Sequence, residues 1–389
     1  MSSKPKVLIP YKLQWDVSDH IPEWEQLSQH VDFVRYRMTD AEAFEQFLPT
    51  SGIEGLWVTD ELFSCLGGPT KFWDYYPSTL KVMVVPWVGC DFIDGRRLRE
   101  EKGVILCNIG PNAGSSVADL AVHLVLSCFR MTTFWEHCFR FVASGNVNDT
   151  RKYLGSKESE WWDSQEAPCN RNAAVSRACF QFPAMADIAN GVNLSQNFKV
   201  GGKLVDTPSG KTSLILGFGS IGQSIGKRLS LGFDMRVKYS KRSGPVSEKL
   251  LGYSAEFCPD LASPKTWHDV DVVVLSLPGS PHTDNLINEQ VLDMCKDGVR
   301  IVNVGRGSCV DEDALLKALE SGKVNSCGLD VFKNETTQVR QDLLMRFDVT
   351  ALPHIGSTVA SLMERQTVIT LQNIESVLVN GGTGVFPVN

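Results

Sequence analysis

The sequence lacks the cysteine patterns that bind metals, although 11 of its 389 residues are cysteine. It has no CxxC pair and no cysteines and histidines at the spacing of a zinc site, so we expect no metal centre. An odd number of scattered cysteines fits a reducing compartment better than a disulfide framework. The N-terminus has no apolar stretch of the length that a signal peptide needs. We therefore predict a cytoplasmic protein whose thiols are mostly buried.

Long apolar runs and basic clusters are also missing. The longest apolar stretches, such as VMVVPWVGC, are well short of the roughly 20 residues of a membrane-spanning helix. Acidic residues outnumber basic ones by 45 to 38, which gives a net charge of −7. A chain of this charge without a basic run offers little to nucleic acid or to anionic lipid. We expect neither partner, and a small molecule as the substrate.

The sequence predicts an α/β protein of two domains, because short apolar runs alternate with helical periods along most of its length. One series starts with KVLIP near the N-terminus. A second starts at Lys211 and contains six strand candidates, the number in a complete dinucleotide-binding sheet. We predict one long helix from Ser115 to about Cys138 and a last helix from Ser357 to about Val379.

The segment of residues 141–210, between the two series, has weak periodicity and carries Trp161 and Trp162. It is too long for an ordinary loop. Two interpretations remain open: the segment packs on another subunit, or it is partly disordered. We favour the first, because tryptophans are costly to leave in water.

The motif GFGSIG directly follows the predicted strand TSLIL and opens a predicted helix. A dinucleotide-binding glycine motif requires this context; the alternative is a glycine turn that binds nothing. Gly217 allows the tight turn, Gly219 lets the backbone approach a pyrophosphate, and Gly222 permits close packing of the helix, whose N-terminus adds positive potential. The other residues assigned to this site within the motif are Phe218, Ser220 and Ile221.

The end of the next strand distinguishes the two nicotinamide dinucleotides. A protein selective for NAD carries Asp or Glu there, which accepts hydrogen bonds from the ribose hydroxyls. This sequence has KYSKRSG instead, so Ser240, Lys241 and Arg242 offer a hydroxyl and two cations to a 2′-phosphate. We predict NADP(H) in preference to NAD(H); the alternative is an exposed basic turn.

Three residues suited to the reduction of a 2-oxo acid follow strands of this second series: Arg306 in VNVGRG, Glu335 in GLDVFKNE and His354 in LPHIGS. Each is unremarkable alone, since single polar residues in loops are usually solvated. The carboxyl ends of parallel strands share one edge of a sheet, however, and such sheets bind their ligands there. We therefore expect the three side chains at one site.

The chain resembles the D-isomer-specific 2-hydroxyacid dehydrogenases over nearly its whole length, and among them the fungal glyoxylate or hydroxypyruvate reductases most. The motifs that carry the resemblance are, in order, VGCDFIDG, SSVADLA, GFGSIG, LPGSPHTDNLIN, VRIVNVGRGSCVDEDALLKALESGKV, GLDVFKNE and LPHIGS. The resemblance implies a Rossmann-type coenzyme domain of residues 113–356, which includes the 141–210 segment. It implies a flavodoxin-like substrate domain of residues 1–112 and 357–389, an active site in the cleft, and a homodimer.

By this resemblance His354 is the general acid and base, Glu335 is its partner and Arg306 clamps the substrate carboxylate. The chemistry of the residues agrees with these roles. A histidine near its pKa can supply the proton that a developing alkoxide needs, and a neighbouring carboxylate favours the imidazolium. A guanidinium can bind a carboxylate through two parallel hydrogen bonds.

The resemblance also implies further contacts. Val88 and Gly89 present backbone groups to the substrate carboxylate, and Trp87 before them shapes the pocket. Asp330 resembles the residue that contacts the nicotinamide amide. The other residues assigned to the coenzyme are Leu277, Pro278, Val304, Gly305 and Gly356.

The predicted function is NADPH-dependent reduction of small 2-oxo acids, such as glyoxylate or hydroxypyruvate, to 2-hydroxy acids. The alternative is a dinucleotide-regulated binding protein on the same fold, like the corepressors that resemble this family. The chain lacks the basic tails and low-complexity arms expected of a nuclear scaffold, so we favour the enzyme. Turnover of NADPH with 2-oxo acids distinguishes the two.

Overall fold

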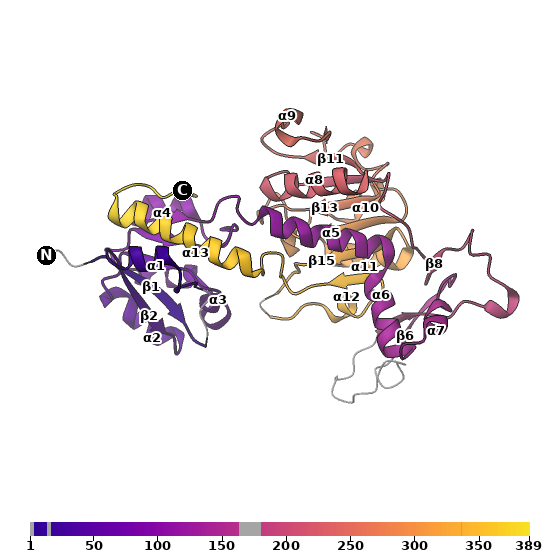
Figure 1. Cartoon of the computed structure of the whole chain (residues 1–389), viewed down its shortest axis with the longest axis horizontal. Helices are drawn as coiled ribbons and strands as arrows, with labels where there is room; N and C mark the ends of the chain where they lie inside the picture. Colours follow the sequence, from indigo (N-terminus) through magenta and orange to yellow (C-terminus); the bar gives the residue numbers. More distant parts are fainter. Residues whose placement is uncertain (1–3, 14–16, 163–179, 336) are drawn as a thin grey trace. The chain divides into compact units, whose positions relative to one another are not determined.

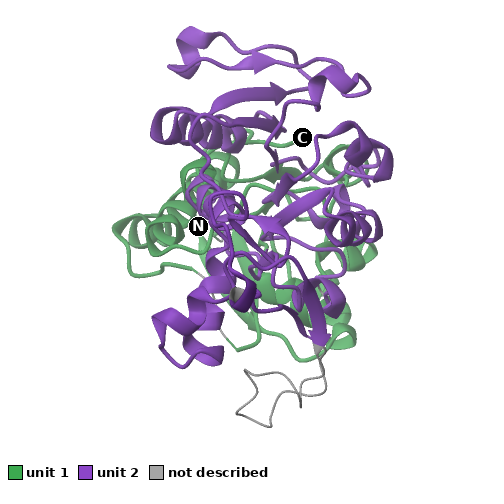
Figure 2. Ribbon diagram, turned by 90° about the vertical axis from the view of Figure 1, so that its right-hand side faces the viewer, with its two compact units in different colours: residues 1–116, 357–389 green, residues 117–356 purple. Residues whose placement is uncertain are grey.

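The computed structural model describes residues 4–13, 17–162, 180–335 and 337–389, and the chain divides into two compact units (Figure 2). Unit 1 comprises residues 1–116 and 357–389, and unit 2 comprises residues 117–356. Each unit contains a parallel sheet covered by helices, so the predicted α/β class is confirmed.

Unit 1 is built on a five-stranded parallel sheet in the order β2-β1-β3-β4-β5, the strand order of flavodoxin-like folds. Alternate residues of a strand point to opposite faces of a sheet. In β1, Leu8 joins one hydrophobic core and Val7 and Ile9 join another, so both faces are covered. The strands are β1 (Lys6–Tyr11), β2 (Asp32–Arg37), β3 (Gly55–Trp57), β4 (Val82–Val84) and β5 (Ile105–Cys107).

The helices of unit 1 come from both ends of the chain. The C-terminal helix α13 ends in a π-helical turn, Glu375–Val379, and places Leu371 and Ile374 in the same core as Val7. The last residue, Asn389, accepts a hydrogen bond from the backbone N–H of Leu106 in β5 at 2.9 Å. The helices are α1 (Pro22–Leu27), α2 (Ala41–Phe47), α3 (Asp60–Leu66), α4 (Gly95–Lys102) and α13 (Ala360–Ile374).

Unit 2 contains a seven-stranded parallel sheet in the order β12-β11-β10-β13-β14-β15-β16. This is the strand order of a dinucleotide-binding sheet with one strand added at its end. Six of the strands were predicted; β12 was missed because two residues are too few to show a period. The strands are β10 (Thr212–Leu216), β11 (Arg236–Ser240), β12 (Glu256–Phe257), β13 (Val272–Leu275), β14 (Val299–Asn303), β15 (Val324–Leu329) and β16 (Val349–Ala351).

Helix α5 packs closely on this sheet where it crosses β15 (Figure 1). A Cβ atom added to Gly328 of β15 would lie 2.9 Å from the Cβ of Leu124, so only glycine permits this approach. The hydroxyl of Ser326 donates to the carbonyl of Cys128 at 2.8 Å. The main helices of unit 2 are α5 (Gly114–Arg130), which begins in unit 1, α8 (Ser220–Phe233), α9 (Glu248–Leu251), α10 (Glu289–Met294), α11 (Glu312–Ser321) and α12 (Gln341–Leu344).

The predicted single helix from Ser115 to Cys138 is wrong, because the structure breaks it at Met131. This residue has a left-handed backbone (φ 54°), and a separate helix α6 (Thr132–His137) follows it. Packing decides the break: the hydroxyl of Thr133 meets that of Thr350 at 2.9 Å, and Phe134 enters a core of its own. In the described part of the chain no single helix is long and apolar enough to cross a membrane; Gly114–Arg130 and Thr132–Val142 pass that test only as a pair, bent by 73°.

The described parts of the 141–210 segment belong to unit 2 and pack on the rest of it. They share a hydrophobic core with α6, in which Tyr153 and Phe182 of the segment contact the ring of Phe134, and Phe134 in turn contacts Phe347. Residues 163–179, which belong to the same prediction, lie outside the described residues. The elements of the segment are α7 (Val147–Arg151), the hairpin of β6 (Ser159–Trp162) and β7 (Phe180–Pro183), and the short hairpin of β8 (Lys199–Val200) and β9 (Lys203–Leu204).

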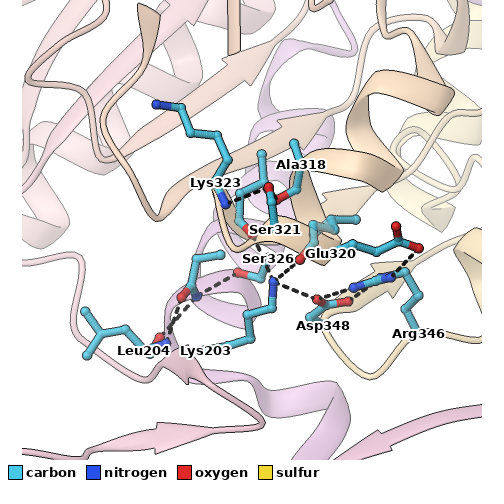
Figure 3. A network of polar contacts seen from close by, with 12 residues as sticks. Lys203, Leu204, Ala318, Glu320, Ser321, Lys323, Ser326, Arg346 and Asp348 are labelled. Carbon is cyan, nitrogen blue, oxygen red and sulfur yellow. Dashed lines mark hydrogen bonds and ion pairs between the residues drawn. The ribbon is translucent and has the colours of Figure 1, made fainter. Parts of the chain in front are cut away.

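A buried network of charges attaches the β8–β9 hairpin to the sheet of unit 2 (Figure 3). The ammonium of Lys203 donates to the carbonyls of Leu319 and Val324 and lies 3.2 Å from a carboxylate oxygen of Asp348. The same carboxylate accepts two hydrogen bonds from Arg346, at 2.8 and 2.9 Å. Burial lowers the pKa of Lys203, and the charge of Asp348 opposes that shift.

Candidate active site

The glycine turn joins β10 to α8, and each of its glycines has a different environment. Gly217 has a left-handed backbone (φ 89°), and a Cβ there would lie 2.7 Å from the carbonyl oxygen of Ser276. A Cβ on Gly222 would lie 2.3 Å from the carbonyl oxygen of Gly217. Around Gly219, at the start of α8, no atom of another described part of the chain lies within 4 Å of such an atom. Two glycines thus close the turn, and the third leaves room for a ligand at the helix N-terminus.

The other residues of the turn divide into buried and accessible ones. Phe218 is fully buried and stacks on Tyr239 of β11, with ring centroids 3.9 Å apart. Ser220 and Ile221 start α8 and remain partly exposed. The first turn of a helix has free backbone N–H groups, so the accessible part of this turn suits a phosphate group.

The predicted 2′-phosphate residues lie next to this turn. Ser240 is the last residue of β11 and is paired in register with Leu216, directly before Gly217. The backbone N–H of Gly217 donates to the carbonyl of Ser240 at 3.2 Å. Lys241 is partly exposed and Arg242 exposed. Two cations therefore stand at the strand end where an NAD-selective protein places a carboxylate.

The ends of β13 and β14 complete this edge of the sheet. The hydroxyl of Ser276 donates to the carbonyl of Gly217 at 2.7 Å, and Leu277 and Pro278 follow it in the chain. A Cβ on Gly305 would lie 2.6 Å from the carbonyl oxygen of Leu277, so the two segments are in contact. Val304, directly after β14, is buried.

Arg306 is held by the buried side chain of Asn303. The amide nitrogen of Asn303 donates to the carbonyl of Arg306 at 2.8 Å, and its oxygen accepts from the N–H of Gly305 at 3.0 Å. The guanidinium donates through Nη1 to the carbonyl of Gly305 at 2.9 Å. Asn303 was not predicted from the sequence, although a polar residue within the run IVNV was a signal.

His354 and Glu335 form a hydrogen-bonded pair. The imidazole Nδ1 lies 2.9 Å from Oε2 of Glu335, and the other carboxylate oxygen accepts from the N–H of Phe332 at 2.7 Å. The bond to Glu335 raises the pKa of His354, although burial and the charge of Arg306 oppose it. For Glu335 burial is the largest influence and raises its pKa, but the imidazole and the N–H of Phe332 outweigh it, so the pKa is lowered. Both shifts favour an imidazolium–carboxylate pair.

The loop that carries His354 is fixed by Asp330, which follows β15. Its two carboxylate oxygens accept hydrogen bonds from the backbone N–H groups of Ile355 and Gly356, at 2.8 and 2.9 Å. Burial raises the pKa of Asp330, and these two bonds lower it in part. His354 itself has a left-handed backbone (φ 55°), which is costly for a residue with a side chain and persists only when its surroundings enforce it. The role of Asp330 as this clamp was not predicted.

In unit 1, Trp87, Val88 and Gly89 form the loop after β4. The carbonyl of Val88 accepts a hydrogen bond from the side chain of Asn108 at 2.7 Å. The ring of Trp87 lies 6.0 Å from that of Phe63, centroid to centroid. The loop is thus held by neighbours of its own unit.

Seven of the nine cysteines that the structure describes are buried, while Cys169 and Cys179 lie outside the described residues. Among described side chains, no group of three or more His, Cys, Asp and Glu is placed to hold a metal ion.

Comparison with known proteins decides the family. Residues 186–356 match the family model described as the NAD-binding domain of D-isomer-specific 2-hydroxyacid dehydrogenases. A protein of Saccharomyces cerevisiae, provisionally named a 2-hydroxyacid dehydrogenase, is 50% identical over 394 residues, which cover 100% of this chain and 97% of the relative. The chain belongs to the D-isomer-specific 2-hydroxyacid dehydrogenases. These enzymes are oxidoreductases that act on CH–OH donors, and the resemblance drawn from the motifs is confirmed.

Two other relatives of this 2-hydroxyacid dehydrogenase have more specific names. A hydroxypyruvate reductase of Thermotoga maritima is 29% identical over 297 residues, which cover 76% of each chain. The crystal structure of a glyoxylate reductase from Paecilomyes thermophila has a TM-score of 0.75 and 25% identity, and the match covers 100% of this chain and 99% of that one. The two-domain α/β architecture is thus shared along the whole chain.

Proposed function

We propose that this dehydrogenase reduces small 2-oxo acids, such as glyoxylate or hydroxypyruvate, and that NADPH is its hydride donor. The observation that carries the proposal is the His354–Glu335 pair, on which the charge of Arg306 also acts. An acid, its carboxylate partner and a guanidinium are the groups that reduction of a 2-oxo acid requires. The names of the hydroxypyruvate and glyoxylate reductases among the relatives support the choice of substrate.

The proton step follows from the geometry of the pair. Because Glu335 engages Nδ1 of His354, the proton for the substrate oxygen comes from the other ring nitrogen, Nε2. The carboxylate keeps the ring oriented and stabilises its positive charge. When bound, the reduced coenzyme supplies the hydride. In the reverse direction the neutral imidazole accepts the proton of the 2-hydroxyl group of the substrate.

Arg306 binds the substrate carboxylate in this proposal. Its planar guanidinium can donate two parallel hydrogen bonds to a carboxylate, which fixes the substrate in one orientation. The backbone groups of Val88 and Gly89 are proposed to serve the same carboxylate, with Trp87 shaping the pocket. Asn303 and Asn108 hold these two segments in place.

The accessible part of the glycine turn and the cations after β11 are proposed to bind NADP(H). The pyrophosphate is placed at Gly219, Ser220 and Ile221, and the 2′-phosphate at Ser240, Lys241 and Arg242. Leu277, Pro278, Val304 and Gly305 line the same sheet edge, and Asp330 and Gly356 are proposed for the nicotinamide end. We expect kcat/KM to be higher for NADPH than for NADH, and a clear preference for NADH contradicts the assignment.

A substrate panel tests the reaction itself. Oxidation of NADPH is followed with glyoxylate, hydroxypyruvate and branched 2-oxo acids, and we expect turnover with the first two. Binding of NADPH without turnover of any acid would favour the dinucleotide-regulated binding protein instead.

A homodimer is proposed as the assembly, with the 141–210 segment taking part. Large apolar side chains are exposed in and beside the described part of this segment, among them Phe141 and Phe198, which are 52% and 48% exposed. Sedimentation of the protein checks the dimer, and Phe141→Ser with Phe198→Ser is expected to weaken it. The cytoplasmic location stays a prediction, which fluorescence of a tagged chain in cells can test.

A further inference from the structure

Glu312, the first residue of α11, is buried in an unusual place for an acid. Asp311 before it caps the helix by accepting from the N–H groups of Asp313 and Ala314, and the side chain of Asp313 after it is 77% exposed. Acids at a helix start usually remain in water, where they interact favourably with the helix dipole. Glu312 is only 6% exposed. A buried carboxylate is costly unless hydrogen bonds compensate, so its partner matters.

That partner lies outside the helix, in the loop that carries Glu335. Oε1 of Glu312 accepts a hydrogen bond from the backbone N–H of Lys333 at 2.9 Å. The preceding N–H, that of Phe332, donates to Oε1 of Glu335 at 2.7 Å. Two consecutive N–H groups of one loop therefore bind two different carboxylates. The carboxylate of Glu335 is also hydrogen-bonded to Nδ1 of His354, at 2.9 Å.

The same loop is also in close contact with the segment of Arg306. A Cβ on Gly307 would lie 1.9 Å from the carbonyl carbon of Phe332 and 2.5 Å from the nitrogen of Lys333. Gly307 thus limits the loop by contact on one side, and Glu312 holds it by a hydrogen bond. Asp330 holds the loop of His354 in a comparable way.

We propose that Glu312 is a positioning residue for the proton-donating pair: its carboxylate fixes the loop of Lys333 so that Glu335 meets the imidazole of His354. The inference rests on the proposed roles of Glu335 and His354. Without the acceptor, the N–H of Lys333 loses its partner and the loop relaxes. Glu335 then no longer holds its oxygen 2.9 Å from the ring.

Three variants of Glu312 separate the effect of its hydrogen-bonding side-chain length from the effect of its charge. Glu312→Ala removes both, Glu312→Asp keeps the charge on a side chain one methylene too short, and Glu312→Gln keeps the length and an acceptor oxygen without the charge. Asp313→Ala is the matched control, because it removes a neighbouring acid of the same helix turn that accepts from Arg340, whereas the backbone N–H of Lys333 donates to Glu312. The charged groups that act on His354, namely Glu335, Asp330 and Arg306, are unchanged in all four.

The readout is the protonation of His354, measured in two ways. NMR titration of the imidazole in the full-length protein needs no substrate, and the signal is identified by its absence in His354→Ala. We expect the pKa to fall by roughly one unit in Glu312→Ala and Glu312→Asp, and to stay close to the parent value in Glu312→Gln and Asp313→Ala. The alkaline limb of kcat/KM for reduction is expected to move to lower pH in the same two variants.

Other outcomes overturn the proposal. An unchanged imidazole pKa in folded Glu312→Asp does so, and this variant decides the question if Glu312→Ala does not fold. An equal fall in Glu312→Gln would show that charge matters rather than the hydrogen bond, and an equal fall in Asp313→Ala would show a general effect of the helix start. If no 2-oxo acid is reduced, the proposed substrate fails, while the NMR titration still tests Glu312.

Discussion

At the scale of single residues, the direction of the pKa shift of His354 determines how the enzyme should depend on pH. Glu335 raises the pKa of His354 through a hydrogen bond and its negative charge, and this outweighs the opposing effects of burial and Arg306. In the proposed reaction reduction requires the imidazolium, so its rate is expected to fall as the pH rises through this raised pKa. Oxidation of the 2-hydroxy acid requires the neutral ring and has the opposite dependence.

His354→Ala is expected to lose the chemical step and keep the coenzyme. Removing a general acid costs about 10²- to 10⁴-fold in kcat. The Kd for NADPH, measured by fluorescence titration, should change little, because the glycine turn and the end of β11 are untouched. A variant with undiminished kcat would remove His354 from its proposed role.

Glu335→Gln is expected to move the alkaline limb of the reduction profile toward acid. Without the carboxylate the imidazolium is less stabilised, so it loses its proton at a lower pH. The measurement is kcat/KM for the 2-oxo acid as a function of pH. Glu320→Gln, at an exposed side chain on α11, serves as the control and should keep the parent profile. Identical profiles for Glu335→Gln and the parent would mean that another group sets the pKa.

At the scale of elements, the sequence predicted the strands that local apolar patterns encode. It failed to predict the helix break, whose position depends on packing between distant residues. Strands buried on both faces are continuous apolar runs, so six strands of unit 2 could be located, whereas β12 is too short for a pattern. No glycine or proline marks the helix break at Met131 in the sequence. Contacts of Thr133 and Phe134 with distant residues cause the break, so it could not be predicted from the local pattern.

The same division applies to the candidate site. Arg306, Glu335 and His354 could be named from motifs at strand ends. Asn303, Asp330 and Glu312 act on the backbone of residues distant in sequence or around a turn, and nothing in their local pattern states which N–H group they bind. The Asp330 clamp and the Glu312 contact therefore became visible only in three dimensions.

The buried charges under the β8–β9 hairpin should make a large contribution to stability through one residue. Asp348→Ala leaves Lys203 and Arg346 buried side by side without their shared carboxylate, which costs about 3–5 kcal/mol. Chemical denaturation measures the change in the free energy of unfolding. Asp297→Ala is the control, since Asp297 pairs with Lys323 at the surface and such pairs contribute about 0–1 kcal/mol. Equal losses in the free energy of unfolding for the two variants would contradict a stabilising role of the buried network.

At the scale of the whole molecule, unit 1 depends on the last residues of the chain. The N–H of Val388 donates to the carbonyl of Leu106, the N–H of Asn108 donates to the carbonyl of Phe386, and Asn389 accepts from Leu106. These bonds pair the edge strand β5 with the C-terminal segment. Unit 2 has no share in them.

Removal of residues 385–389 is therefore expected to destabilise unit 1 selectively. The three bonds to Leu106 and Asn108 alone, at about 1 kcal/mol each, give a loss of about 3 kcal/mol. The bonds of Val385 and Phe386 to Asn373 and of Asn389 to Gly95 and Val104 are lost as well, so the total loss is larger. Hydrogen exchange should rise in peptides that cover β5 and stay constant in those that cover β10, which serve as the internal control. Equal protection of β5 in both proteins would show that the C-terminal segment contributes nothing to its stability.

Because unit 1 is assembled from the first and the last parts of the chain, its completion is tied to the order of synthesis. The ribosome delivers β1 to β5 early, yet α13 covers one face of their sheet only after all of unit 2 has emerged. A nascent chain that stops at Gly356 already contains the seven strands of the coenzyme-binding sheet, while the apolar side chains of β1 and β4 are covered by α1 but still lack the residues that α13 contributes to their core. Translation that ends early therefore yields a dinucleotide-binding unit attached to an unfinished, aggregation-prone partner.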